Sequence, residues 1–386
     1  MRWQRWPHTR VPCAAVSAST RAMATRPGSA PQQPTRRRLL AAMAALGVVT
    51  TGGLLWQQSR LQAPRWVSAV RKPTGQYAVV ALAADGRLIW EFGLPHRGHS
   101  VVPSPDGQLL AAFPRRPGQT IWLLDSTDGR LLRTLQAGPG RQMNGHGVFS
   151  ADGRSLLVTE TVFGETTHGE IAVYDVRSGA LTRRFASGGL DPHQCLWCGG
   201  LLAVAHGGYI EFPNRSKPKQ LDPLRPPNLA WLDASSGQLR RADVLADPGL
   251  SIRHLAADGE AVFAGFQHDD GPAARASLLG YATPAQPLQP MTADATTWAA
   301  FNGYVGSVAL DATGLQVIAT SPKGGVLGIW DRRNLAFAGL RRQADVCGVA
   351  ADEQGWVASS GFGVVMNAAA EVVRTGYAFD NHLAVI

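Results

Sequence analysis

The sequence is poor in several residue types and motifs, and each shortage narrows the range of functions. No acidic residue precedes Asp85, while nine of the 37 basic residues lie in positions 1–63. The remaining positions carry 28 basic and 28 acidic residues, so the basic excess gives no support to nucleic-acid binding by the folded part. The sequence also lacks a nucleophile elbow, a glycine-rich phosphate loop after a strand and an H-E-x-x-H motif. Motifs therefore leave open whether the protein is an enzyme.

Cysteine is scarce as well, with Cys13 near the start, Cys347 on its own, and the pair Cys195 and Cys198. The pair forms a C-x-x-C motif, but Gly199 follows it in place of a histidine, which excludes attachment of a c-type haem. On an extended strand the two sulfurs point to opposite faces, so a disulfide or a shared metal requires a bend. We expect a structural role for the pair, with a disulfide as the alternative.

The N-terminal segment predicts export from the cytoplasm. Residues 1–34 are basic and predicted to be disordered, and Arg36-Arg37-Arg38 precede a moderately apolar segment over 39–56. A twin arginine in this position resembles a bacterial twin-arginine export signal, which predicts a periplasmic protein. The alternative is an uncleaved tether to the inner membrane through residues 39–56, because no clean Ala-x-Ala site follows. We expect residues 35–63 to be the signal or anchor and residues 64–386 to be the folded domain.

Seven similar stretches recur through the folded domain at a spacing of several tens of residues. Each opens a short β-type segment, which in most cases ends in a turn such as Pro105-Asp106-Gly107 or Ala151-Asp152-Gly153. Asp and Gly accept the backbone angles of turns, and further β-rich runs follow to give four strands per unit. This repetition is typical of a β-propeller, in which the first strand of every blade lines a central channel. The stretches begin at His99, His146, His193, His254, Ser307, Cys347 and His382.

The number of hairpins predicts the number of blades and how the ring closes. Hairpins after the third strand fall near Ala84, Asp125, Asp175, Asp233, Tyr281, Asp331 and Asn367, which gives seven units. The first unit, Trp66–Leu94, supplies only three strands, and the chain ends on an apolar run over 381–386. We predict an all-β, seven-bladed propeller of the WD40, YVTN or quinoprotein-like type. Its last strand should close blade one from the inside, because closure removes an exposed sheet edge.

Several blocks in this order resemble one bacterial family. They include Arg97-Gly98-His99, Asn144-Gly145-His146, Asp191-Pro192-His193, Ile252-Arg253-His254 and Tyr304-Val305-Gly306. As a set over residues 66–386 they are similar to the family named domain of unknown function 1513. Its members are Tat-exported propellers, often encoded beside imelysin-type iron-uptake lipoproteins and a dihaem-peroxidase-like protein. The resemblance implies a setting in iron uptake with imelysin-like partners, and no defined reaction. One block departs, because the family tends to carry Thr-His-Pro where this chain has Glu211-Phe212-Pro213.

Five of the seven first-strand positions are histidines, which predicts a cluster of imidazoles at one mouth of the channel. Imidazole binds copper, zinc, iron and nickel, and sites of two or three histidines bind tightly. We therefore predict a metal site for Cu, Fe or Zn, made of His99, His146, His193, His254 and His382 with Glu160 as a candidate oxygen ligand. One alternative is structural, because in WD-type propellers a Gly-His pair hydrogen-bonds an aspartate and pins the blade. Another is that one of the histidines is a catalytic base.

Arginines accompany the histidines and predict a second kind of site. Guanidinium groups clustered near a channel mouth bind carboxylate or phosphate groups bidentately and repel a bare cation. This favours an anionic ligand, a chelated metal or an acidic partner over a free metal ion. The alternative is that the arginines pair with Asp191, Asp345 and Asp380 on adjacent loops. The ligand-binding residues we predict are Arg97, Arg115, Arg116, Arg141, Arg253 and Tyr304.

The longest interruption of the repeat is 206–228, which is rich in Pro, Lys and Arg. Insertions of this size in a compact repeat are usually binding loops or surface decoration, so it is a candidate cover for the channel mouth or a docking loop.

The sequence leaves three candidate functions for the protein. The first, which we favour, is a periplasmic binding or accessory protein linked to metal uptake. The others are a metal-dependent or quinone-linked oxidoreductase that uses the same histidines, and a purely structural interaction scaffold.

Overall fold

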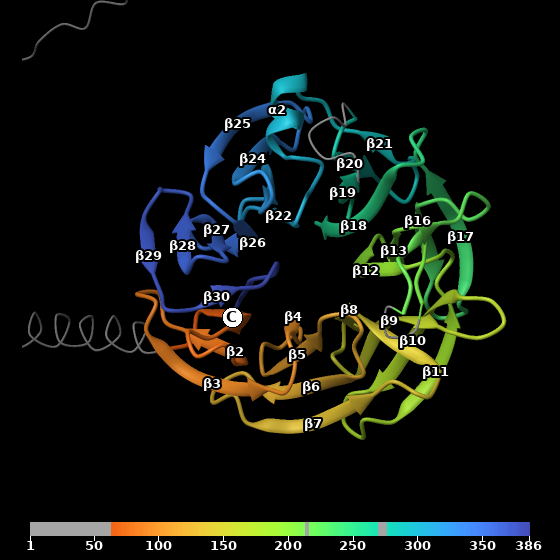
Figure 1. The fold of residues 1–386 in the computed structure, drawn as a ribbon, viewed down its shortest axis with the longest axis horizontal. Coiled ribbons are helices and arrows are strands. Elements are labelled where there is room, and N and C mark those ends of the chain that lie inside the picture. The colour runs from red at the N-terminus through yellow and green to blue at the C-terminus, as the bar shows by residue number, and fades with distance from the viewer. Residues whose placement is uncertain (1–62, 213–215, 269–275) are drawn as a thin grey trace, which may run out of the picture. The chain divides into compact units, whose positions relative to one another are not determined.

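Seven antiparallel sheets stand around a central axis as the blades of a propeller in the computed structural model (Figure 1). The structure describes residues 63–212, 216–268 and 276–386. The predicted disordered leader and the predicted tether over 39–56 lie outside these residues, as does nearly all of the export segment. Within the described residues, no helix has both the length and the apolar character needed to cross a membrane. The prediction of an all-β, seven-bladed propeller is confirmed.

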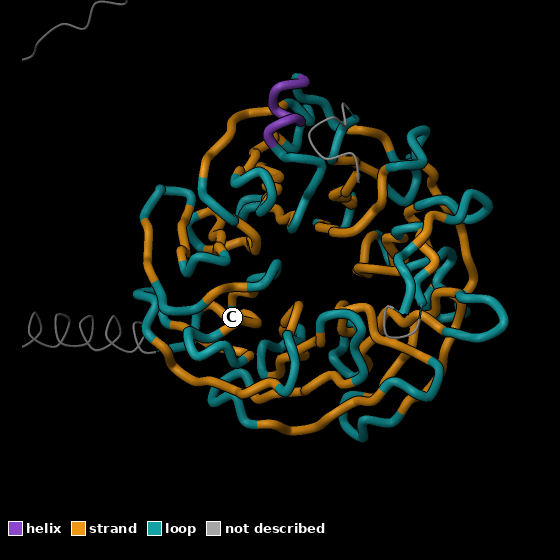
Figure 2. The backbone as a smooth tube through the Cα atoms, in the orientation of Figure 1, coloured by secondary structure: helices purple, strands orange, loops and turns teal. Residues whose placement is uncertain are grey.

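In each blade the strands lie side by side in order from the channel to the rim, as Figure 2 shows in orange. Blade two comprises β4 (Gly98–Pro103), β5 (Leu109–Pro114), β6 (Thr120–Asp125) and β7 (Leu131–Gln136). Blade three comprises β8 (Arg141–Phe149), β9 (Ser155–Val162), β10 (His168–Asp175) and β11 (Leu181–Ala186). Blade four comprises β12 (Pro192–Cys198), β13 (Leu201–His206), β16 (Asn228–Asp233) and β17 (Gln238–Val244), with the small hairpin β14 (Tyr209–Ile210) and β15 (Gln220–Leu221) inserted.

The second half of the ring repeats this plan. Blade five comprises β18 (Leu250–Ala257), β19 (Val262–His268), β20 (Leu279–Ala282) and β21 (Gln289–Pro290). Blade six comprises β22 (Ser307–Leu310), β23 (Gln316–Ser321), β24 (Val326–Asp331) and β25 (Phe337–Arg342). Blade seven comprises β26 (Val346–Asp352), β27 (Gly355–Ser360), β28 (Val364–Asn367) and β29 (Val372–Arg374). One short helix, α2 (Ala295–Ala300), begins where the Asp294 carboxylate accepts a hydrogen bond from the Thr297 amide and leads from blade five to blade six.

Blade one joins the two ends of the described chain. The strands β1 (Trp66–Arg71), β2 (Tyr77–Leu82) and β3 (Leu88–Leu94) form its outer part. Its innermost position is filled by β30 (Ala378–Phe379) and β31 (Ala384–Val385), which both pair with β1. The predicted closure by the C-terminal strand is therefore confirmed. Between the two short strands, residues 380–383 leave the ladder and enter the channel region.

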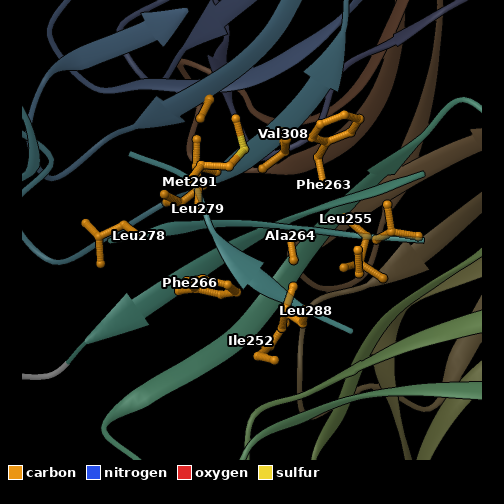
Figure 3. Close-up of a cluster of buried hydrophobic side chains, with 14 of the residues drawn as sticks. Ile252, Leu255, Phe263, Ala264, Phe266, Leu278, Leu279, Leu288, Met291 and Val308 are labelled. Carbon is orange, nitrogen blue, oxygen red and sulfur yellow. The ribbon is translucent and has the colours of Figure 1, made fainter. Parts of the chain in front are cut away.

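The core lies between neighbouring blades, because the second and third strands of each blade are buried on both faces. Strand β5, for example, is buried from Leu110 to Pro114, whereas most of the outermost strand β7 is exposed. Such two-sided burial explains why these strands read as continuous apolar runs. In the cluster that Figure 3 shows, Phe263 of β19 lies beside Val308 of β22 in the next blade, and Phe266 of β19 is the cross-strand partner of Ile252 in β18. Rigid packing of this kind fixes the inner strands and therefore the residues that face the channel.

The C-x-x-C pair belongs to this core. The Cys195 side chain packs in the cluster with Leu202 and Val204, and Cys198 packs in another cluster with Trp231 and Leu255. Both thiols are free, and burial raises the pKa of Cys195 to about 12 and that of Cys198 to about 11. The expected structural role agrees with this packing on opposite sides of β12.

Candidate metal centre and anion pocket

Irregular inner strands carry the histidines to the channel. The pairing of β4 with β5 shifts register between Gly98 and Val101, where His99 lies, and that of β8 shifts between Met143 and Gly147, beside His146. Equivalent shifts occur at His193 in β12 and at His254 in β18, and His382 lies in the break between β30 and β31. A β-bulge re-aims the side chain at the extra residue. By contrast, β22 pairs with β23 in unbroken register from Ser307 onward.

The five imidazoles form a closed ring. Neighbouring ring centroids in the order 99, 146, 193, 254, 382 and back to 99 lie 4.8, 4.6, 5.0, 5.0 and 4.8 Å apart. Across the ring, His146 also lies 4.7 Å from His382. Most of the pairs meet edge to face, as expected for rings packed at this distance. Residues separated by up to 283 positions thus meet at one place through the blade geometry alone.

Burial keeps the ring histidines uncharged. His99, His146, His193 and His254 are each at most 6% exposed. Burial, reinforced by the neighbouring imidazoles, holds the pKa of His146, His193, His254 and His382 well below the ordinary value of 6.5. Burial also lowers the pKa of His99, although the Asp380 carboxylate opposes the shift. Neutral imidazole is the form that binds a metal ion.

The hydrogen bonds separate His99 from the other four histidines. The Nδ1 atom of His99 lies 2.9 Å from an Asp380 carboxylate oxygen. One ring nitrogen of each of the others is buried with no hydrogen-bond partner among the described residues: His146 Nε2, His193 Nδ1, His254 Nδ1 and His382 Nε2. The pinning role known from WD-type propellers therefore accounts for His99 and leaves the other four without an explanation. A buried polar atom without a partner costs free energy, so four at one place call for a ligand.

Two groups of three histidines have the spacing for a shared metal ion, and they have His146 in common. In the group His99, His146 and His193, and in the group His146, His254 and His382, the ligand atoms lie within 4.8 Å of one another. Nitrogens bound to a tetrahedral ion at roughly 2.1 Å are about 3.4 Å apart, so a group would need to contract by on the order of 1 Å. The donor set, the spacing and the unpartnered nitrogens therefore fit a transition-metal ion.

The remaining predicted ligand, Glu160, belongs to a different cluster. Its carboxylate accepts a hydrogen bond from Tyr174 at 3.0 Å and lies 3.2 Å from Arg184 and 3.7 Å from Arg141. Among the described residues, the groups with metal-ligand spacing contain histidines alone. Cys347, the first-strand residue of blade seven, donates its thiol to backbone carbonyls, including that of Asp380 at 3.2 Å. The structure thus brings the five histidines together and leaves Glu160 in an ion-pair network of blade three.

The backbone behind the ring is tied between blades. The Thr159 hydroxyl in β9 lies 3.2 Å from the His146 carbonyl and 2.8 Å from the His193 carbonyl. Ser68 in β1 donates to the carbonyl of His382 at 2.6 Å. These contacts fix the bulged segments against the regular second strands, so the imidazoles are held in place by side chains that do not touch the channel.

A pocket of about 590 Å³ opens directly above the ring. His99, His193 and His254 form part of its wall, so a molecule in the pocket contacts the imidazoles. Four of the six predicted ligand-binding residues, Arg115, Arg116, Arg253 and Tyr304, also line it. The other two do not. Arg97 borders a neighbouring pocket of about 230 Å³, and Arg141 pairs with Glu170 and Glu160 in blade three.

Two aspartates organise the arginines, as the alternative from the sequence expected. Asp380 binds Arg97 at 2.6 Å and Arg115 at 3.3 Å. Asp191 pairs with Arg116 through one oxygen and with Arg253 at 2.7 Å through the other. Asp345 lies with Arg97 and Asp380 in the smaller pocket. Arg115, Arg116 and Arg253 therefore have acidic partners and also face the larger pocket, whereas Arg97 faces the smaller one.

The described residues on both sides of 213–215, in the insertion of blade four, line the pocket. Phe212 and Ser216–Lys219, which flank the undescribed residues 213–215, are part of its lining. Glu211 also lines it and binds Arg116 at 3.1 Å and Gln142 at 2.7 Å. Sequence reasoning missed Glu211 as a site residue, although it lies where the chain departs from the family pattern. The sequence prediction also missed three lining residues, Asn144, Gln267 and Asn381. Two of them, Asn144 and Asn381, lie next to the first-strand histidines His146 and His382 in the sequence, and this position could have identified them.

Fold and site together define a seven-bladed propeller whose inner strands bring five imidazoles together beneath a pocket lined by arginines. The family model described as "Protein of unknown function (DUF1513)" matches residues 92–386, and the chain belongs to this family. No curated protein matches the chain. A solved structure of a functionally unknown protein from Desulfotomaculum acetoxidans DSM 771 is similar, with a TM-score of 0.58 and 10% sequence identity over 84% of this chain and 99% of that chain. At this identity the likeness concerns the fold alone.

Proposed function

We propose that this propeller is a metal-binding protein that holds a transition-metal ion in the ring of five histidines. The observation that carries the proposal is the set of four buried imidazole nitrogens without a hydrogen-bond partner among the described residues. A ring that served only to pin blades would satisfy these atoms with protein groups, as His99 is satisfied by Asp380.

The donor set narrows the choice of ion. Imidazole suits Cu, Zn, Fe and Ni, whereas Mg²⁺, Ca²⁺ and Mn²⁺ prefer oxygen ligands. Every ring donor is a neutral nitrogen, so the protein ligands leave the charge of the ion uncompensated. Neutral ligands attract a cation less strongly than thiolates or carboxylates do, so this ligand set suits an ion that is taken up and released again. We therefore favour a binding or accessory role over a catalytic one.

The setting that we propose is the periplasm, with metal uptake as the process. The twin-arginine motif at Arg36-Arg37 supports export, and the family resemblance supports a place beside iron-uptake proteins of the imelysin type. The twin-arginine pathway carries folded proteins, which agrees with a metal site that exists only after the ring has closed.

Elemental analysis of the natively exported protein tests the metal proposal. We expect about one equivalent of copper, iron or zinc after gel filtration, and loss of most of it in His146→Ala, because His146 belongs to both groups of three. His206→Asn is the matched control, since His206 is a buried histidine outside the ring with its Nε2 atom 2.9 Å from the Ser187 hydroxyl. The proposal fails if the exported protein is metal-free and added Cu²⁺, Zn²⁺ and Fe²⁺ leave its unfolding transition unchanged.

A further inference from the structure

We infer that the pocket above the ring binds a small polycarboxylate, which reaches the site together with the metal ion as one anionic chelate. This inference rests on the proposed metal site and names the form in which the ion is bound. The pocket and the ring share His99, His193 and His254, so a ligand in the pocket can contact the ion directly.

The arginines at the base of the pocket are held in place for an anion. Arg253 is only 3% exposed, binds Asp191 at 2.7 Å and lies 5.3 Å from the centre of the Tyr209 ring. Its Nε atom is buried with no hydrogen-bond partner among the described residues. Asp191 adopts a φ of 58°, which is unusual outside glycine, and a Cβ at Gly207 would collide with Asp191 and Arg253. A strained backbone and a required glycine are both maintained around this pair, which is typical of binding sites.

The charges around the pocket do not cancel. Among the described residues, the cations that line the pocket are Arg115, Arg116, Arg253, Lys217 and Lys219, and the acids that contact them or line the pocket are Asp191, Glu211 and Asp380. The difference is two positive charges, and the neutral ring histidines contribute none. A divalent ion below would add two more. Uncompensated charge in a partly buried site is costly, so the ion and an anion with several negative charges should bind together.

The distribution of lysine supports an anion at this mouth. The chain has four lysines, Lys72, Lys217, Lys219 and Lys323, and all of them lie in loops that join the second strand of a blade to the third. In an antiparallel blade these loops and the start of the innermost strand lie at the same end, so every lysine is on the side where the histidines enter the channel. Lys219 stacks on Tyr209 at 3.6 Å and Lys323 on Tyr304 at 4.8 Å. Such a field raises the local concentration of anions.

The size and lining of the pocket favour a polycarboxylate over a single inorganic oxyanion. About 590 Å³ is in the range of sites for small organic molecules and far exceeds what one sulfate fills. Planar guanidiniums reach the pocket from blades two and five, which suits carboxylates on separate arms of one molecule. Phe212, Pro218 and Tyr304 give the wall apolar surface for a carbon skeleton.

Isothermal titration with citrate, tricarballylate and sulfate tests this inference on metal-free and metal-loaded protein. We expect both tricarboxylates to bind the metal-free protein, citrate to bind more tightly once Zn²⁺ is present, and sulfate to bind weakly. Arg115→Gln should weaken citrate binding by at least about tenfold, because it removes a charge-assisted contact. The double variant Lys217→Ala and Lys219→Ala changes two exposed side chains and should also weaken citrate binding. Arg141→Gln, an arginine outside the pocket, should leave the affinity unchanged.

The outcomes separate the two proposals. If the metal site is wrong and the anion site is right, tricarballylate still binds, Arg115→Gln still weakens it, and His146→Ala has no effect on it. If the protein holds metal but neither tricarboxylate binds, or if Arg115→Gln and Arg141→Gln bind citrate equally, the polycarboxylate inference is overturned and the metal site stands.

Discussion

Mild acid should unfold the metal-free protein at a pH where carboxylates are still ionised. Desolvation holds the pKa of the buried His146, His193 and His254 and of the half-buried His382 well below 6.5, and burial lowers the pKa of His206 to about 4. Above pH 6.5 these groups are neutral in both the folded and the unfolded chain and do not affect stability. Below pH 6.5 the unfolded chain takes up protons that the folded chain cannot, so stability falls as the pH falls.

The magnitude follows from the number of groups. At pH 5.5, one unit below the unfolded pKa, each such histidine lowers the free energy of unfolding by about 1.4 kcal/mol, so the five together lower it by about 7 kcal/mol. Single domains are stable by roughly 5–15 kcal/mol, so this loss is a large part of the total. Asp380 acts in another window: its depressed pKa contributes stability above about pH 3.9, and that contribution is lost only at lower pH.

Guanidinium unfolding between pH 8 and pH 5, in the presence of a chelator, measures this dependence. The free energy of unfolding should be flat from pH 8 to 7 and then fall with a slope that approaches five protons. His146→Leu should lower the slope by about one proton. A free energy of unfolding that stays level down to pH 5 would show that the ring histidines are accessible or protonated in the folded state, and would refute the reasoning.

Three further predictions concern single residues. His146→Leu should raise the free energy of unfolding of the metal-free protein by about 1 kcal/mol, because it removes an unpartnered buried nitrogen. With Zn²⁺ at a hundred times its Kd the wild type gains about 2.7 kcal/mol and becomes more stable than the variant. Unfolding curves with and without Zn²⁺ measure both differences. Thr159→Val should lower the free energy of unfolding by about 1–3 kcal/mol, because the single hydroxyl proton, which lies nearest to the buried His193 carbonyl and close to that of His146, is lost. An unchanged free energy of unfolding in chemical denaturation would mean that the bulged segments do not depend on this hydroxyl. Gly145→Ala should lower the free energy of unfolding by about 2 kcal/mol or more and shift the NMR signals of the His99 ring. The reason is that Gly145 has a φ of 91° and that a Cβ there would lie 2.7 Å from the His99 ring. Unchanged His99 signals would contradict this prediction.

The fold was predictable because its determinants are local and repeated. Turns such as Ser104–Gly107 and Ser150–Gly153 use the same chemistry, in which a serine hydroxyl and an aspartate carboxylate close the turn and a glycine takes a positive φ. A repeat of such hairpins has few other ways to bury its strands, so seven units implied seven blades. The meeting of the histidines followed from the same repetition.

The sequence does not predict in the same way which polar residues line the pocket and which form ion pairs away from it. Arg115 and Arg141 both lie at the histidine end of their blades, yet one faces the pocket and the other pairs with Glu160 and Glu170. That difference depends on which acid lies within reach: Arg141 meets the acids of its own blade, whereas Arg115 meets Asp380 of blade one, and sequence order does not encode these distances. The position of Glu160 in the chain predicts a metal ligand, whereas Tyr174, Arg184 and Arg141 of blade three contact its carboxylate.

Because β30 and β31 close blade one, the candidate centre is complete only when the whole ring has folded. Asp380 and His382 lie in the break between these strands, so a chain whose blade one is still open has only four of the five imidazoles and lacks the carboxylate that orients His99. Any ion or anion that engages His382 together with the other blades also bridges the seam of the ring, and opening the seam then requires its release. The seam of the propeller and its candidate metal centre are thus one place, and an ion held there would keep the ring closed.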